Sequence, residues 1–238
     1  LKDGNGYRIN GAKTYISSGQ TADFIIVVAK TDPNERAKGI SLMLLETEGA
    51  EGFQRGKKLD KIGLDAADTS ELFFDDVFVP AENVLGGEEG KGFYQLMGEL
   101  PQERLIIAMG AMTGIEKALE TTLDFVKNRK AFGQTIWDFQ NTQFVMADLK
   151  ARATAAKIFV NDCIAKHLKR ELDVPTACMA KYWVTELQGE VVDKCLQFHG
   201  GAGFINDYPI ARMYRDSRIT RIFGGSNEVM KMVIARSM

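Results

Sequence analysis

Residues 98–129 read GELPQERLIIAMGAMTGIEKALETTLDFVKNR, and this stretch decides the fold of the second half of the chain. Pro101 lies near its start, where the first turn of a helix tolerates proline because the missing amide would be unpaired there. Apolar residues follow at intervals of three or four, the period of an amphipathic α-helix: Leu105, Ala108, Met112, Ile115, Leu119, Leu123 and Val126. The stretch predicts one long helix with a continuous apolar stripe.

Two charged residues occupy the opening turn of this predicted helix. Glu103 and Arg104 are adjacent there, and Arg129 closes the stretch. A carboxylate at a helix start usually interacts favourably with the helix dipole on a solvated face. From the residues alone this is the simpler interpretation of Glu103, and a catalytic role is the alternative.

Two further segments, residues 145–168 and 176–198, carry the same helical pattern, and residues 227–238 predict a last helix. Thr176 is expected to cap the third helix, after the break at Val174 and Pro175. The apolar positions of these helices are Leu149, Ala153, Ala156, Val160 and Ile164 in the second, and Met179, Trp183, Leu187, Val191 and Cys195 in the third. Long amphipathic helices with short connections predict a bundle.

Residues 1–88 predict β-structure instead. Asn10 and Gly11 lie between two alternating runs, a pattern typical of a tight hairpin. Apolar runs of strand length follow at residues 24–30, 40–47 and 71–79, and Pro80 stops the last one. No helical pattern interrupts them, so the sheet should be antiparallel, a partial barrel or sandwich with too few strands to close. The predicted fold class is α+β, with a β domain at residues 1–88 and an all-α bundle domain at residues 89–238.

Composition excludes several classes of protein. The 238 residues are 45% hydrophobic and 26% charged, with a net charge of -2, so no basic excess favours nucleic acid. No apolar run approaches the length of a membrane span. The cysteines Cys163, Cys178 and Cys195 are predicted to be reduced core thiols. The chain begins with Leu1, and we expect it to continue a longer protein.

Two glycine-rich sites and one aromatic residue could face a ligand. HGGAGF (residues 199–204) is either a helix C-cap or a close backbone approach to a ligand. IFGGSNE (residues 222–228) is either an ordinary N-cap or a set of free amides for a polar group. Phe132 beside Gly133 is either a loop anchor or a cofactor platform. His167 and His199 lack the spacing of metal ligands, so no metal site is expected.

Several blocks, in their order along the chain, resemble the acyl-CoA dehydrogenase family. They are NGAKTYISSG, ELFFDDVFVP, ERLIIA, RKAFGQ, QFHGGAGF, YRDSRI and GGSNE. The resemblance implies a middle β domain and a C-terminal four-helix bundle, with the N-terminal helical domain of the family absent from this chain. The chain then contains the C-terminal part of the middle domain and the complete bundle.

The resemblance also implies a reaction, the α,β-dehydrogenation of an acyl-CoA thioester with bound FAD. Many members carry the catalytic base at a position that is Gly224 here, and glycine cannot serve. The family's alternative position is Glu103, which becomes the expected α-proton base. The Gly224 amide would donate to the thioester carbonyl, and Arg104 would lie near the acyl-CoA and help to position Glu103. The surrounding blocks favour long-chain-type members.

The resemblance assigns the FAD contacts as well. Tyr15 and Ser17 match residues beside the isoalloxazine ring, whereas Arg129, Phe132 and Gln140 match residues that hold the nucleotide. A third set would contact FAD from a neighbouring subunit, and in it Glu228 departs from a common glutamine: Gln197, Gly201, Ser226 and Glu228.

The expected partners follow from the same resemblance. The protein should form a homodimer or homotetramer and pass electrons to an electron-transfer flavoprotein, in the bacterial cytoplasm or the mitochondrial matrix. An oxidase of the same fold is an alternative. A non-catalytic or nucleic-acid-associated relative is another, which the net charge opposes.

Overall fold

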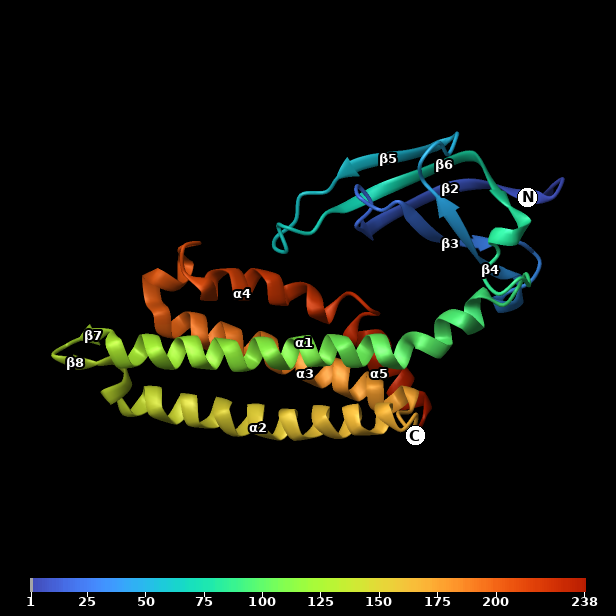
Figure 1. Cartoon of the computed structure of the whole chain (residues 1–238). Helices are drawn as coiled ribbons and strands as arrows, with labels where there is room; N and C mark the ends of the chain where they lie inside the picture. Colours follow the sequence, from blue (N-terminus) through green and yellow to red (C-terminus); the bar gives the residue numbers. More distant parts are fainter. Residues whose placement is uncertain (1) are drawn as a thin grey trace. The chain divides into compact units, whose positions relative to one another are not determined.

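The computed structural model describes residues 2–238, so the predicted continuation of the chain before Leu1 lies outside the described residues. The chain divides into two compact units, Leu1–Glu99 and Leu100–Met238. The first is built of strands and the second of helices, as the sequence predicts (Figure 1). The boundary between the units lies within one helix, and a domain boundary near residue 88 stays a prediction.

The first unit contains a four-stranded antiparallel sheet and a separate strand pair. The sheet has the order β1-β2-β6-β5 and consists of β1 (Lys2–Asp3), β2 (Gly6–Ser17), β6 (Thr69–Pro80) and β5 (Phe53–Lys58). The pair joins β3 (Phe24–Lys30) to β4 (Ile40–Glu46), with Val27 opposite Met43. Short 3-10 helices η1 (Ala37–Gly39) and η2 (Ala81–Asn83) lie in the connections. One core joins both sheets and includes Tyr7, Val27, Leu45, Leu72, Phe74 and Val79.

The predicted hairpin at Asn10 and Gly11 is wrong. Strand β2 continues through both residues, and its pairing with β6 shifts by one residue between Ile9 and Gly11. Gly11 has φ of 145°, and the side-chain Oδ1 of Asn10 accepts a hydrogen bond from the Asp76 amide at 2.8 Å. A β-bulge needs the same residue types as a tight turn, so the local pattern did not distinguish the two.

Helix α1 (Gly92–Asn128) contains nearly all of the predicted helical stretch, residues 98–129. It begins before Pro101, so the prediction that Pro101 opens the helix is wrong, and the proline interrupts one backbone hydrogen bond inside it. The predicted stripe is confirmed, because six of its members are buried and Leu123 packs half-buried against them: Leu105, Ala108, Met112, Ile115, Leu119 and Val126.

The remaining helices complete the second unit. Helices α2 (Gln140–Leu168) and α3 (Val174–His199) run beside α1, and α4 (Pro209–Ser217) and α5 (Asn227–Arg236) pack on α3 (Figure 1). A small hairpin, β7 (Lys130–Ala131) and β8 (Gln134–Thr135), connects α1 to α2. Three short 3-10 helices link the rest: η3 (Ile136–Asp138), η4 (Gly200–Phe204) and η5 (Arg218–Arg221).

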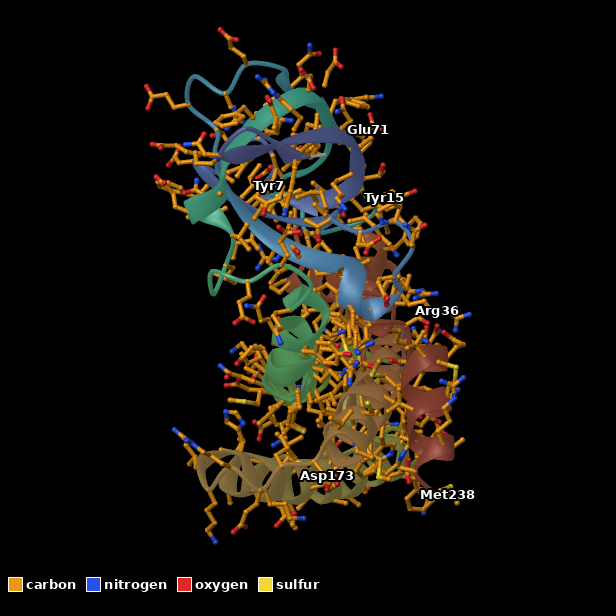
Figure 2. The ribbon with its side chains drawn as sticks, turned by 90° about the vertical axis from the view of Figure 1, so that its right-hand side faces the viewer. Tyr7, Tyr15, Arg36, Glu71, Asp173 and Met238 are labelled. Carbon is orange, nitrogen blue, oxygen red and sulfur yellow. The ribbon has the colours of Figure 1, made fainter. Side chains whose placement is uncertain are left out.

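Helix α3 differs from its prediction in two ways. Its N-cap is Asp173, whose carboxylate accepts the Thr176 amide at 2.7 Å, so Thr176 is not the cap (Figure 2). Met179 and Trp183 are 38% and 39% exposed, although both belong to the predicted apolar face. A spacing of four exceeds the helical period of 3.6, so the predicted row turns away from the core. The buried face of α3 includes Lys181 instead.

Candidate functional site

Glu103 lies on α1 with its side chain exposed, one helical turn before Ile107. Residues four apart on a helix share a face. Gly224 lies against that face, because a Cβ atom added to Gly224 would be 2.3 Å from Cδ1 of Ile107. Gly224 has φ of 63°, a conformation that glycine adopts readily and other residues rarely adopt. The structure therefore brings Glu103 and the glycine loop before α5 to one part of the helical unit.

The glycine loop leads directly into α5. Ser226 is the N-cap residue, with φ of -62° and ψ of 157°, and Glu228 lies in the first turn of the helix. The pKa of Glu228 is lowered, first by a hydrogen bond from its own backbone amide and then by the Ser226 hydroxyl. The loop thus presents backbone amides and a carboxylate at a helix start.

Arg104 points into the bundle, unlike its exposed neighbour Glu103. The residue is 6% exposed, and its Nη1 atom donates to the sulfur of Cys178 at 3.3 Å. Among residues 2–238, Nε of Arg104 has no hydrogen-bond partner. Burial raises the pKa of the Cys178 thiol, and the Arg104 charge partly offsets that rise. Contact between Arg104 and a substrate stays a prediction.

A buried polar network behind the glycine loop was missed by the sequence analysis. Nζ of Lys181 donates to the carbonyl of Gly225 and to Oδ1 of Asn227, both at 2.8 Å. Lys181 is fully buried and Asn227 is 1% exposed. Lys181 follows an apolar run within the helix. Its charge within this run is the one sequence signal for a buried polar site.

The predicted nucleotide-binding residues Arg129, Phe132 and Gln140 gather around the β7–β8 hairpin. The carbonyl of Arg129 accepts the Ile136 amide at 2.8 Å, and Gln140 is the first residue of α2. Phe132 is 95% exposed and has φ of 53°. Its ring contacts Phe139 edge-on, with the centroids 6.3 Å apart. A ring so exposed leaves its face available to a planar ligand.

Gln197 lies in the last turn of α3 and Gly201 lies in η4, which follows it, and both residues are exposed. Between them, His199 stacks on Phe125 of α1 with ring centroids 4.2 Å apart. Burial lowers the pKa of His199, and its Nδ1 atom hydrogen-bonds to the carbonyl of Cys195 at 2.8 Å. The stack places the end of α3 beside the end of α1, close to the hairpin.

Two groups of predicted residues therefore lie at opposite ends of the bundle (Figure 1). Glu103 lies near the start of α1, and Arg129 directly follows its last residue. The rise of an α-helix over the residues between them corresponds to about 39 Å. Ser226 and Glu228 lie at the same end of the bundle as Glu103, because the glycine loop before them lies against α1. Phe132 and Gln140 lie near Arg129, at the β7–β8 hairpin.

Tyr15 (Figure 2) belongs to the first unit, near the end of β2. Ser17 is the last residue of that strand. Tyr15 is 79% exposed and has φ of 64°, at an irregularity in the pairing of β2 with β6. Ser17 is exposed and pairs with Thr69. An exposed aromatic ring on a left-handed residue packs little of its surface, which leaves the ring free to contact a ligand.

Other features of the described chain contain none of the residues predicted to bind substrate or FAD. Across residues 2–238, no cluster of His, Cys, Asp or Glu could hold a metal ion, and no helix is long and apolar enough to cross a membrane. Cys163, Cys178 and Cys195 are free and buried, which agrees with their predicted role as reduced core thiols. A groove of about 620 Å³ between α1 and α2 includes Met112, Trp137 and Met146, but none of the predicted site residues.

Comparison with known families identifies the chain's relatives. The family model for the acyl-CoA dehydrogenase C-terminal domain matches residues 90–238, and that for the middle domain matches residues 1–77. The chain belongs to the acyl-CoA dehydrogenase family. The resemblance seen in the sequence and the α+β fold class are thereby confirmed.

Individual relatives agree with this family. The chain is 49% identical over 239 residues to the mitochondrial long-chain specific acyl-CoA dehydrogenase of Sus scrofa, covering 100% of this chain and 55% of that protein. It is 46% identical to the crystal structure of an acyl-CoA dehydrogenase from Geobacillus kaustophilus, with a TM-score of 0.96 over 99% of this chain and 62% of that one. It is 37% identical to the caffeyl-CoA reductase-Etf complex subunit CarC of Acetobacterium woodii, covering 98% of this chain and 61% of that protein. The chain therefore spans a little over half the length of such acyl-CoA dehydrogenases.

Proposed function

We propose that the protein containing this chain is an FAD-dependent acyl-CoA dehydrogenase that converts a fatty acyl-CoA to the trans-2-enoyl-CoA. One observation carries the proposal: Gly224 lies against Ile107, one turn after Glu103. The carboxylate and the glycine-loop amide can then act on neighbouring atoms of one thioester. Membership in the acyl-CoA dehydrogenase family supports the reaction class.

Glu103 is the proposed base that takes the α-proton, and its exposed side chain is accessible to a substrate. The Gly224 amide is the proposed donor to the thioester carbonyl. That hydrogen bond stabilises the negative charge that develops on the oxygen as the proton leaves, and it makes the α-proton more acidic. Arg104, the next residue of α1, is proposed to lie near the acyl-CoA and to help position Glu103.

The residues of the chain fit a flavin nucleotide. Tyr15 and Phe132 offer exposed aromatic rings, and Ser17, Gln140 and Arg129 offer polar groups. When bound, FAD supplies the acceptor for the hydride that leaves the β-carbon. We propose that Tyr15 and Ser17 lie beside the flavin ring and that Arg129, Phe132 and Gln140 hold the nucleotide.

The separation within the bundle supports an oligomer. An extended FAD molecule is shorter than the roughly 39 Å of helix between Glu103 and Arg129. We propose that the β7–β8 hairpin and the glycine loop of one subunit contact two different FAD molecules. Each FAD then draws contacts from more than one subunit, to which Gln197, Gly201, Ser226 and Glu228 contribute. We propose that the protein forms a homodimer or homotetramer.

The similarity to named relatives supports the finer assignments. The likeness to a long-chain specific enzyme favours a long acyl chain. The likeness to a subunit of an Etf complex favours an electron-transfer flavoprotein as the electron acceptor. The mitochondrial relative favours the matrix if the source is eukaryotic, and the cytoplasm is proposed for a bacterial source.

The proposal is tested with Glu103→Gln in the full-length protein. We expect FAD content to be unchanged and the turnover of acyl-CoA to fall about 10²- to 10⁴-fold, because the base is lost. Flavin bleaching without oxygen, across a series of acyl-CoA lengths, measures the reaction and the chain-length preference together. Glu99→Gln, an exposed carboxylate one turn earlier on α1, is the matched control and should react as the wild type does. Bound FAD with no bleaching in the wild type would refute the proposed function.

A further inference from the structure

We propose that Lys181 is a positioning residue that holds the 224–227 loop, so that the Gly224 amide meets the thioester carbonyl. The inference rests on the proposed function and adds a residue from α3 to the site. Lys181 itself touches no reacting atom, because its ammonium group lies behind the loop and is fully buried. It acts through the loop.

The contacts of Lys181 converge on this loop. Its Nζ atom donates at 2.8 Å to the carbonyl of Gly225, the residue after Gly224. It donates at 2.8 Å to Oδ1 of Asn227, the first residue of α5. A buried ammonium is costly unless its donors are satisfied. Here both of these acceptors belong to one loop, so the bonds that satisfy Lys181 also fix the loop to α3.

The side-chain NH₂ group of Asn227 orients the residue for this contact. Its Nδ2 atom donates to Oγ1 of Thr185 at 3.0 Å and to Oε1 of Glu186 at 2.8 Å. With both amide protons used on α3, Oδ1 must face Lys181. The Thr185 hydroxyl is itself fixed, because it donates to the carbonyl of Lys181 at 2.8 Å.

The loop needs such an anchor because two adjacent glycines form it. Gly224 and Gly225 have φ of 63° and 88°, and glycine loses more backbone freedom on ordering than any other residue. Without a fixed carbonyl at Gly225, the neighbouring Gly224 amide would sample several directions. An oxyanion donor is effective only when it is already aimed at the developing charge. Lys181 supplies that order from behind the loop.

The surroundings of Lys181 make its charge sensitive to alkaline pH. The pKa of Lys181 is lowered to about 8, chiefly by burial and to a smaller extent by the nearby Arg104 of α1. Glu186 of α3, Glu228 of α5 and the Cys178 thiol oppose that change. Above pH 8 the ammonium loses a proton and its charge-assisted bonds to the loop weaken. A neutral amine keeps two N–H donors. Deprotonation should therefore weaken the bonds to the loop less than a substitution that removes the amine.

The test compares Lys181→Gln with Lys194→Gln, an exposed lysine on the same helix, in the full-length holoenzyme. We expect kcat of Lys181→Gln to fall about 10- to 100-fold, because the amide is misplaced, with KM changed far less. A 3-thia-acyl-CoA carries sulfur at the β-position, so it can exchange its α-hydrogen but cannot be dehydrogenated. We expect its α-hydrogen exchange in D₂O, followed by mass spectrometry, to slow by a similar factor. The Lys194→Gln protein should match the wild type.

A second variant guards against misfolding of the first. Thr185→Val keeps the side-chain shape and removes the hydroxyl that orients Asn227, so it should slow α-hydrogen exchange in the same direction by a smaller factor. If Lys181→Gln folds with FAD bound and exchanges α-hydrogen at the wild-type rate, the inference is overturned whatever the turnover. If the wild-type holoenzyme neither exchanges nor turns over any acyl-CoA, the proposed function fails first.

Discussion

The contact between Gly224 and Ile107 makes a quantitative prediction about stability. Gly224→Ala adds a Cβ atom 2.3 Å from Cδ1 of Ile107, in a backbone conformation with φ of 63°. Ile107→Val removes that Cδ1 atom and leaves Cγ1 at 3.8 Å, an ordinary van der Waals contact. The two substitutions should therefore be coupled, with the valine relieving part of the damage that the alanine causes.

The expected free energies of unfolding follow from two separate costs. The left-handed conformation costs an alanine about 1–2 kcal/mol, and Ile107→Val does not change this. The steric overlap costs about 1–3 kcal/mol, and the valine removes it. Ile107→Val alone costs about 0.5–1 kcal/mol, since the side chain is half-buried. We expect a favourable coupling of about 1–3 kcal/mol in the double variant, the size of the overlap that the valine removes.

Urea unfolding followed by far-UV circular dichroism reports on the helical unit and measures this cycle. Gly110→Ala is the matched control, because an added Cβ meets no atom within 4 Å there. It lies inside α1, so it should stabilise the helix by about 0.5–1 kcal/mol and show no coupling to Ile107→Val. Effects of Gly224→Ala and Ile107→Val that add within about 0.5 kcal/mol would refute the contact.

Two further predictions concern the base and a helix cap. Moving the carboxylate with Glu103→Gly and Gly224→Glu should restore partial turnover, and adding Ile107→Val should raise it further, as measured by flavin bleaching; inactivity with bound FAD in both proteins would contradict the shared geometry. Asp173→Ala should lower the unfolding free energy by about 1 kcal/mol, because the Thr176 amide loses its acceptor. Hydrogen bonds from Thr176 lower the pKa of Asp173, so its contribution is complete above the unfolded pKa and is lost as pH falls through the folded pKa. Urea unfolding at pH 7 and at acidic pH measures this difference, and a pH-independent difference would contradict it.

The sequence by itself determined the features that depend on local periodicity. The apolar stripe of α1, from Leu105 to Val126, follows from the helical spacing of its residues, because a helix presents its own residues in a fixed repeat. The strand at Phe24–Lys30 follows from a continuous apolar run of strand length. The family blocks located Glu103 and Gly224, although nothing in their spacing along the chain showed that they meet. Local patterns failed where one set of residues suits two structures, as at Asn10 and Gly11.

Only the tertiary structure decided which loop meets which helix. Gly224 lies against Ile107 although well over a hundred residues separate them, since the packing of α5 on α3 brings the loop there. The tertiary structure also makes Lys181 part of the site. Its charge is tolerated in the core because Gly225 and Asn227 accept hydrogen bonds from its ammonium group. No local preference of a lysine predicts such acceptors, because they come from a distant part of the chain and exist only once it has folded.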